Sequence, residues 1–369
     1  MYIQTRIMTI MPHAHRGSVS FFVVVGVIVA TLIIPTTALA SIPLDENGKV
    51  TLFGDVRLRI EADDREKQNA VTNNRERWRY RARFGVAFKV NDNWSGKLRL
   101  ATGNGMNSPH NTFSTADSPP SGSNLGFDQA YIAFTGVKNL TVIGGKTSFN
   151  FWQQTEVFWD NDINPDALAL VYKTGPLTLN AAYVVVIDGG WSDDLTAFTY
   201  QGVYNGGSGN MKYTLAVGGA SLDAPTDMDA TDDGLVDGLH ADNHWIISGQ
   251  LRTGPWRLGI DYLQSNADTE DTAYVAQIRF KVNKVLGLRA YYYYVETYAT
   301  PGDGVFTQDN FGSNEPSADN LKGPRLQLDY NLGPNSSMDV RYYNAKLITK
   351  GVDTQDDRSR MQINFNVKF

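Results

Sequence analysis

The sequence predicts an all-β chain that forms a transmembrane antiparallel β-barrel of about 16 strands. Three observations support this fold class. The segment 75–90 alternates arginine with apolar residues at the period of a β-strand. Long and short polar connections alternate along residues 41–369. The final segment, 358–369, is amphipathic and ends on an aromatic residue, Phe369.

Residues 1–40 have the pattern of a secretory signal peptide. Arg6 and Arg16 precede an apolar run at 21–34, and Ala38-Leu39-Ala40 places small residues before a cleavage point at Ser41. The run is short for a bilayer span, which disfavours the alternative, a signal anchor. We therefore expect a barrel domain at 41–369. The chain contains no cysteine, so disulfides and thiolate metal sites are excluded.

The first strands are expected at 49–62, at 75–90 and from Trp94. In 75–90, RERWRYRARFGVAFKV, one face is largely apolar and the other carries the arginine row, which is Arg75, Arg77, Arg79, Arg81 and Arg83. A helix would mix these two faces, whereas a strand separates them. The segment is long enough to cross a bilayer when tilted. The alternative is a surface strand of a soluble β-protein with its arginines in water.

The remaining strands follow from the connections between them. Seven short connections fall near Asn91, Val137, Gly175, Gly206, Thr253, Asn283 and Gly333. Eight long ones are expected at 63–74, 103–125, 147–165, 188–194, 221–243, 265–270, 297–320 and 350–357. Outer-membrane barrels combine short periplasmic turns with long external loops, and a β-sandwich has no reason to keep that order. No segment of 41–369 is a continuous apolar stretch of transmembrane-helix length.

The last strand carries a further signal. Met361, Ile363, Phe365, Val367 and Phe369 form one face of 358–369. Barrel-assembly machinery reads an amphipathic last strand that ends on Phe, so we expect Phe369 to be the assembly signal.

A resemblance to a known family is carried by four stretches: FGDVRLRIEADD, RERWRYRARFGVAFKVNDNWSGKLRLATGN, WDNDINPDALALVY and WRLGIDYLQSNAD. They are similar to segments of the putative porins of Gram-negative bacteria, a branch of the sixteen-stranded porin superfamily. The resemblance covers essentially all of 41–369 and implies a homotrimeric channel whose loop after strand five folds into the bore. The Pro-Glu-Phe-type signature of general diffusion porins is absent, so the resemblance does not specify pore size or solute.

In a closed barrel the polar faces line the bore, because an Arg or Lys on the lipid face near the midplane costs about 2–4 kcal/mol. Closure pairs the last strand with the first. We therefore expect one continuous basic wall, with Lys368 beside it, made of Arg57, Arg59, Arg75, Arg77, Arg79, Arg81, Arg83, Lys97, Arg99, Arg358 and Arg360.

The connection 147–165, which we call the constriction loop, is both aromatic and acidic. Its rings are expected to pack against the inner wall while its acids face the arginines; these residues are Phe149, Phe151, Trp152, Glu156, Phe158, Trp159, Asp160, Asp162 and, at its end, Asp166. The resulting transverse field would orient dipolar solutes and tune ion selectivity. In the alternative, the arginines pair with lumen acids and water to hold the wall together, and the two roles can coexist.

These expectations lead to the hypothesis of a water-filled outer-membrane channel for passive diffusion of small hydrophilic solutes and ions. Lipid, lipopolysaccharide and the assembly machinery would be its partners, and it would need no cofactor. Anion preference is favoured, since bases line the bore and acids cluster in external loops. The alternatives are a substrate-specific anion or sugar channel and a non-conducting structural or adhesive barrel.

Other features of the sequence bear on metal binding, catalysis and nucleic-acid binding. The stretch 221–243 carries seven aspartates and no Lys or Arg, which is typical of a solvated external loop or of a divalent-cation site beside lipopolysaccharide. Catalysis is not expected, because neither Asp242 with His244 nor Ser248 with His244 comes with a nucleophile motif. Nucleic-acid binding is not expected either, because no basic patch lies in an exposed context.

Overall fold

The computed structural model describes residues 41–67, 75–103, 110–113, 124–149, 151–188, 194–223, 241–301, 320–349 and 355–369. The expected signal peptide, 1–40, lies outside these ranges, and so does most of the aspartate-rich stretch, 224–240. None of the described residues belongs to a helix that is long and apolar enough to cross a membrane.

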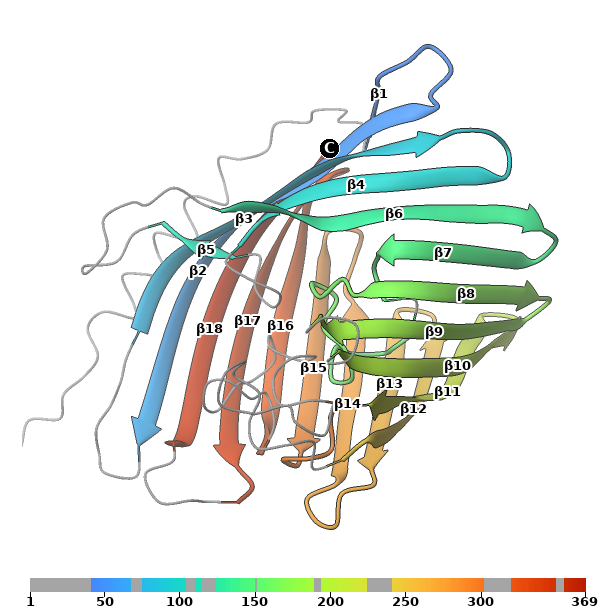
Figure 1. Cartoon of the computed structure of the whole chain (residues 1–369). Helices are drawn as coiled ribbons and strands as arrows, with labels where there is room; N and C mark the ends of the chain where they lie inside the picture. The colour runs from blue at the N-terminus through green and yellow to red at the C-terminus, as the bar shows by residue number, and fades with distance from the viewer. Residues whose placement is uncertain are drawn as a thin grey trace, which may run out of the picture. The chain divides into compact units, whose positions relative to one another are not determined.

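Sixteen long antiparallel strands close into one barrel, which confirms the predicted fold class (Figure 1). Each long strand pairs with the next one along the chain, and β18 pairs with β2. Two-residue strands, β1 (Ile42–Pro43) and β5 (Asn111–Thr112), pair with β2 and β3. The long strands are β2 (Val50–Lys67), β3 (Arg75–Lys89), β4 (Trp94–Thr102), β6 (Leu125–Val137), β7 (Leu140–Lys146), β8 (Asp166–Thr174), β9 (Leu177–Ile187), β10 (Leu195–Ser208), β11 (Met211–Asp223), β12 (Asn243–Thr253), β13 (Trp256–Ser265), β14 (Thr272–Lys281), β15 (Leu286–Val295), β16 (Leu321–Gly333), β17 (Ser336–Leu347) and β18 (Gln355–Lys368).

The strand boundaries differ from the sequence prediction at several places, of which two bear on the bore. The turn expected near Gly206 lies between β10 and β11, where Gly209 has a φ of 56°, a conformation that glycine adopts without strain. The predicted loop from Asp63 is wrong at its start, because β2 continues to Lys67. Asp63 accepts hydrogen bonds from Arg358 at 2.7 Å, so its polarity marks a bore-facing position and not a loop.

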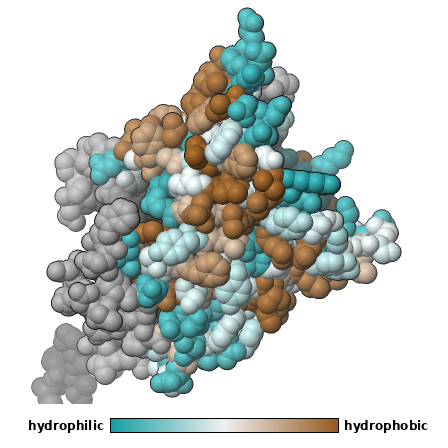
Figure 2. Space-filling view, turned by 45° about the vertical axis from the view of Figure 1, so that its right-hand side comes forward, coloured by the Kyte–Doolittle hydropathy of each residue, from teal (hydrophilic) through white to brown (hydrophobic). Residues whose placement is uncertain are grey.

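The outward faces of the strands are apolar. Leu168, Val217 and Ile247 are each more than half exposed, at 57%, 61% and 55%. Figure 2 shows hydrophobic side chains gathered over the middle of one face of the molecule. Next to short turns, Trp94 packs on Phe134 and Trp256 packs on Phe280, with ring centroids 4.7 Å and 4.4 Å apart. An apolar band bordered by aromatic pairs suits a lipid environment.

A cluster of buried hydrophobic residues lies inside the barrel. Val157, Phe158, Trp159 and Ile163 of the constriction loop pack with inward-facing side chains such as Val184 on β9, Leu222 on β11, Ile246 on β12 and Leu263 on β13. These residues are 8% exposed or less. The loop therefore fills part of the bore and rests on the inner wall.

The barrel closes at the seam between β18 and β2. Bore-facing polar side chains join the two strands: Arg57 donates to Asn366 and Arg59 to Asn364, both at 2.7 Å, and Gln362 donates to Glu61 at 2.8 Å. At the end of the chain, the backbone of Phe369 exchanges hydrogen bonds with Gly54 at 2.8 and 2.9 Å. The Phe369 ring occupies the space that a Cβ at Gly54 would need.

Candidate functional site

The arginine row of β3 faces the bore, opposite a strand, β2, that carries both acids and arginines on the same face. Across the β2–β3 pair, Arg83 lies opposite Asp55, Arg77 opposite Glu61 and Arg75 opposite Asp63, while Arg81 and Arg79 lie opposite Arg57 and Arg59. Three of the five arginines of the row thus face an acid of β2, whereas the other two face an arginine. Sequence alternation places Asp55 and Glu61 on the inner face, but it does not show which arginine each of them contacts.

Ion pairs join the row to those acids. Asp55 accepts from Arg83 Nε at 2.8 Å and from Arg81 Nη2 at 2.7 Å, and Glu61 pairs with Arg77. Asp63 is shared by Arg75, Arg358 and Arg360, at 3.1, 2.7 and 3.4 Å. The structure therefore brings most of the expected basic wall into direct contact with wall acids.

The other expected wall residues lie beside this row. Arg99 pairs with Asp128 of β6 at 2.6 Å. Lys97 has no ion pair among the contacts described, and its ammonium lies 4.3 Å from the centre of the Phe53 ring, a cation–π contact.

Asp162 connects the constriction loop to the arginine row. Its Oδ1 lies 2.9 Å from Nη1 of Arg81 and 2.9 Å from Nη1 of Arg83. The three side chains are 15%, 5% and 14% exposed. Since Asp55 accepts from the same two arginines, two carboxylates and two guanidinium groups form one cluster in which acid from the loop faces base on the wall.

Two other predicted loop acids make contacts inside the loop. Asp160 accepts from the backbone amide of Asp162 at 2.7 Å, and Glu156 accepts from Asn161 at 2.6 Å. These bonds shape the turn that presents Asp162.

The prediction that Asp166 faces the arginines is wrong. Asp166 is the first residue of β8, is 59% exposed, and pairs with Lys146 of β7 at 3.4 Å. It shares the outward side of its strand with Leu168 and Leu170, so its carboxylate points away from the bore.

The aromatic residues of the loop stack on one another. Phe149 lies 4.2 Å from Trp159 and 5.1 Å from Phe151, and Phe151 lies 5.1 Å from Phe158, measured between ring centroids. The Trp159 indole donates to the carbonyl of Ile163 at 3.0 Å, and the Phe151 ring covers Gly218 of β11. This stack gives the loop a compact form inside the barrel.

A second attachment holds the middle of the loop on β12–β14. Asp261 accepts from the amide and hydroxyl of Thr155, at 2.7 and 2.5 Å, and from the Ser248 hydroxyl at 2.6 Å. The Gln154 side chain fills the space beside Gly259 and bonds to Gln250 and Gln277, which flank that glycine in the sheet. Sequence reasoning missed this attachment, although alternation along β13 places both Gly259 and Asp261 on the inner face.

His110, in the second long connection, lies against the same wall. Its backbone carbonyl accepts from Arg79 at 3.1 Å, and its Nε2 lies 3.5 Å from Nη1 of Arg57. Burial, together with the nearby guanidinium groups of Arg59 and Arg57, lowers the pKa of His110 well below its usual value. Because arginine can only donate, the contact also requires an unprotonated Nε2.

Among the interactions described, Ser248 and His244 bond to other partners and not to each other. Ser248 donates to Asp261, and buried His244 contacts the carbonyl of Ala241 at 3.3 Å. Over the described ranges, no three His, Asp or Glu side chains are grouped so that they could hold a metal ion.

Comparisons with known proteins agree with this architecture. Residues 66–205 match the family model described as "Putative porin". No curated protein matches the chain. Similar solved structures include OprB of Pseudomonas putida (12% identity, TM-score 0.60, 87% of this chain and 94% of that one). A mutant of Rh. blastica porin (12%, 0.51, 87% and 100%) and a loop L8 deletion mutant of OmpT of Vibrio cholerae (13%, 0.53, 87% and 99%) are also similar.

At these identities the solved structures establish the fold, and the family model identifies the sequence pattern. The resemblance predicted from the sequence is confirmed over residues 66–205, which carry the pattern of the putative porin family, and the barrel has the fold of outer-membrane porins.

Proposed function

We propose that the protein is an outer-membrane porin that lets small hydrophilic solutes and ions diffuse through a bore narrowed by the constriction loop. The observation that carries this proposal is the cluster in which Asp162 of the loop meets Arg81 and Arg83 of the wall. The proposed passage runs beside this cluster, so that solutes in it meet charges of both signs.

The inward-facing charges favour anions. The acids near the arginine row balance only part of its positive charge. Lys97 and Arg57 add positive charge beside the row, and Arg57 bonds to the neutral side chain of Asn366. A positive excess in a water-filled bore with low-dielectric walls raises the local concentration of anions. We propose a modest anion preference on this basis.

The outer membrane is the proposed location. The apolar outward faces and the aromatic pairs beside the turns support it, and so does the fold that the chain shares with outer-membrane proteins. Export by residues 1–40, recognition of Phe369 by assembly machinery and trimer formation belong to the same proposal.

Planar-bilayer recording of the refolded barrel tests the channel. We expect stable single-channel steps in symmetric KCl and a reversal potential of anion-selective sign in a KCl gradient. Replacing Arg79, Arg81 and Arg83 with Gln should move the reversal potential toward cation selectivity. Absence of conductance from a barrel that is folded by circular dichroism would refute the porin proposal and favour the non-conducting alternative.

A further inference from the structure

A second group of cations, which the sequence prediction did not include, lines the inner wall on β11–β15. Lys212 lies opposite Arg252, Arg252 opposite Arg257, Arg257 opposite Arg279, and Arg279 opposite Arg289. Five cations therefore occupy directly paired positions on five consecutive strands. We call these five residues the basic belt.

The side chains of the belt face the bore. Arg252, Arg257 and Arg279 each lie two positions from a residue that meets Gln154 of the constriction loop, namely Gln250, Gly259 and Gln277. Arg289 lies two positions from Tyr291, which is buried in the interior cluster. Residues two apart on a strand share a face, so the belt and the loop contacts are on the same inner surface.

The belt carries more positive charge than its surroundings balance. Asp329 lies 2.6 Å from Arg289 and 3.6 Å from Arg279. Arg252 donates to the neutral amide of Gln250. Within the described part of the chain, no carboxylate forms an ion pair with Lys212, Arg252 or Arg257. Like charges at directly paired positions are destabilising, so an arrangement of this kind indicates a role for a bound anion.

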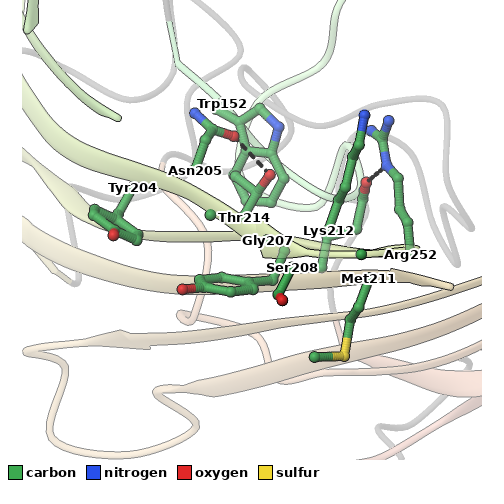
Figure 3. A pocket seen from close by; sticks show the side chains of 13 residues that line it. Trp152, Tyr204, Asn205, Gly207, Ser208, Met211, Lys212, Thr214 and Arg252 are labelled. Atoms are coloured by element: carbon green, nitrogen blue, oxygen red, sulfur yellow. Dashed lines mark hydrogen bonds between the residues drawn. The ribbon is translucent and has the colours of Figure 1, made fainter. Parts of the chain in front are cut away.

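Space for a ligand lies next to the belt. Lys212 and Arg252 line a hollow of about 740 Å³, with Trp152 at its border, and Figure 3 shows the two cationic side chains extending side by side. Arg252 also lines a second hollow, of about 610 Å³, together with Arg257, Arg279 and Arg289. Arg252 therefore borders both hollows, and each hollow is lined by further cations of the belt. Each volume is that of a small-molecule site.

We propose that the basic belt binds solutes with two or more phosphoryl groups, such as an oligophosphate or a bisphosphate ester, on their way through the bore. Guanidinium groups bind phosphate oxygens in pairs, and this geometry suits phosphate better than halide. Neighbouring strands are about 4.8 Å apart, so adjacent phosphoryl groups can each reach two belt residues. The proposal rests on the proposed function, since the solute reaches the belt through the channel.

The belt lies at the end of the barrel that carries the short turns, only one to three residues from those turns. Short turns face the periplasm in outer-membrane barrels. A solute that has passed the Asp162 cluster would therefore meet the belt last.

The test uses inorganic tripolyphosphate as the probe, on the full barrel in a planar bilayer and, separately, by titration calorimetry in detergent. We expect tripolyphosphate to block the KCl current and to bind saturably. Substitutions R257Q and R279Q together should weaken both effects by about tenfold or more, as expected when charge-assisted hydrogen bonds are lost. The matched control is K49Q with K138Q, which removes two exposed lysines beside turns at the same end and should leave both effects unchanged.

Three results would overturn the belt proposal: no saturable calorimetric binding, equal weakening by the control pair, or equally strong block by citrate, a multivalent carboxylate. The two proposals fail separately. If KCl current is present but tripolyphosphate neither binds nor blocks, the porin stands and the belt site is refuted. If current is absent, calorimetry with wild-type and R257Q/R279Q barrels still shows whether the basic belt binds tripolyphosphate.

Discussion

The substitution Asp162→Asn removes the loop charge that faces the arginine row and keeps the size of the side chain. Arg81 and Arg83 then share Asp55 as their remaining carboxylate among the contacts described above. The local charge rises by one unit, so we expect the channel to become more anion-selective.

The size of the effect follows from Coulomb's law. An ion that passes about 6 Å from the carboxylate interacts with it by about 0.7 kcal/mol in water, and by about 0.4 kcal/mol after screening in 0.1 M salt. A change of about 0.4 kcal/mol alters the local concentration of a monovalent ion about twofold. Because the local concentration of anions rises about twofold and that of cations falls about twofold, the ratio of anion to cation permeability should rise about fourfold.

The assay is the reversal potential in a tenfold KCl gradient. Asp166→Asn is the matched control, since it makes the same chemical change at an outward-facing position near the loop end. A D162N reversal potential equal to that of the wild type, or an equal shift in D166N, would refute the placement of Asp162 at the constriction. The substitution should have a second effect, which single-channel noise measures. Each lost hydrogen bond between charged groups costs about 1.5–3 kcal/mol, so the constriction loop should also fluctuate more.

Three further predictions follow from the site and the seam. Gly259→Leu should displace Gln154 from its place on β13 and increase open-channel noise, whereas unchanged noise would contradict the attachment. Phe369→Ala should lower the yield of heat-modifiable folded barrel on electrophoresis, because the ring that covers Gly54 is lost; a wild-type yield would argue against that role. Because its pKa is lowered, His110 stays neutral from pH 6 to 8, so the reversal potential should show no step near pH 6.5; a step that H110Q abolishes would contradict this.

The architecture was largely predictable because the sequence of each strand by itself indicates the two faces and the ends of that strand. Alternation along one strand gives its inward and outward faces, and turn residues give its ends, so the strand number and the inward arginine row needed no long-range information. The same local reasoning fails at Asp63. A polar residue at the end of an apolar pattern predicts a loop, but the partner of Asp63 is Arg358, near the other end of the chain.

The rest of the site depends on register between strands and on the path of a loop. Alternation places Arg257, Arg279 and Arg289 on inner faces, but only the pairing register places them side by side. The direction of the Asp166 side chain depends on the residue at which β8 begins. Because successive residues of a strand point to opposite faces, a shift of one position decides whether this side chain faces the bore or the lipid. The contact of Thr155 with Asp261 joins parts of the chain that no periodicity connects.

The meeting of Phe369 with Gly54 has a consequence for the width of the channel. A barrel's diameter depends on its number of strands and on the stagger accumulated around it, and the stagger becomes fixed when the last strand joins the first. A slip by one position would turn the faces of β18 over, but a slip by two would keep arginines and amides in the bore, opposite other polar residues of β2. It would also move the Phe369 ring from a glycine onto Leu52 or Val56, where a side chain already occupies the space. A single residue without a side chain therefore helps to set the circumference of the barrel.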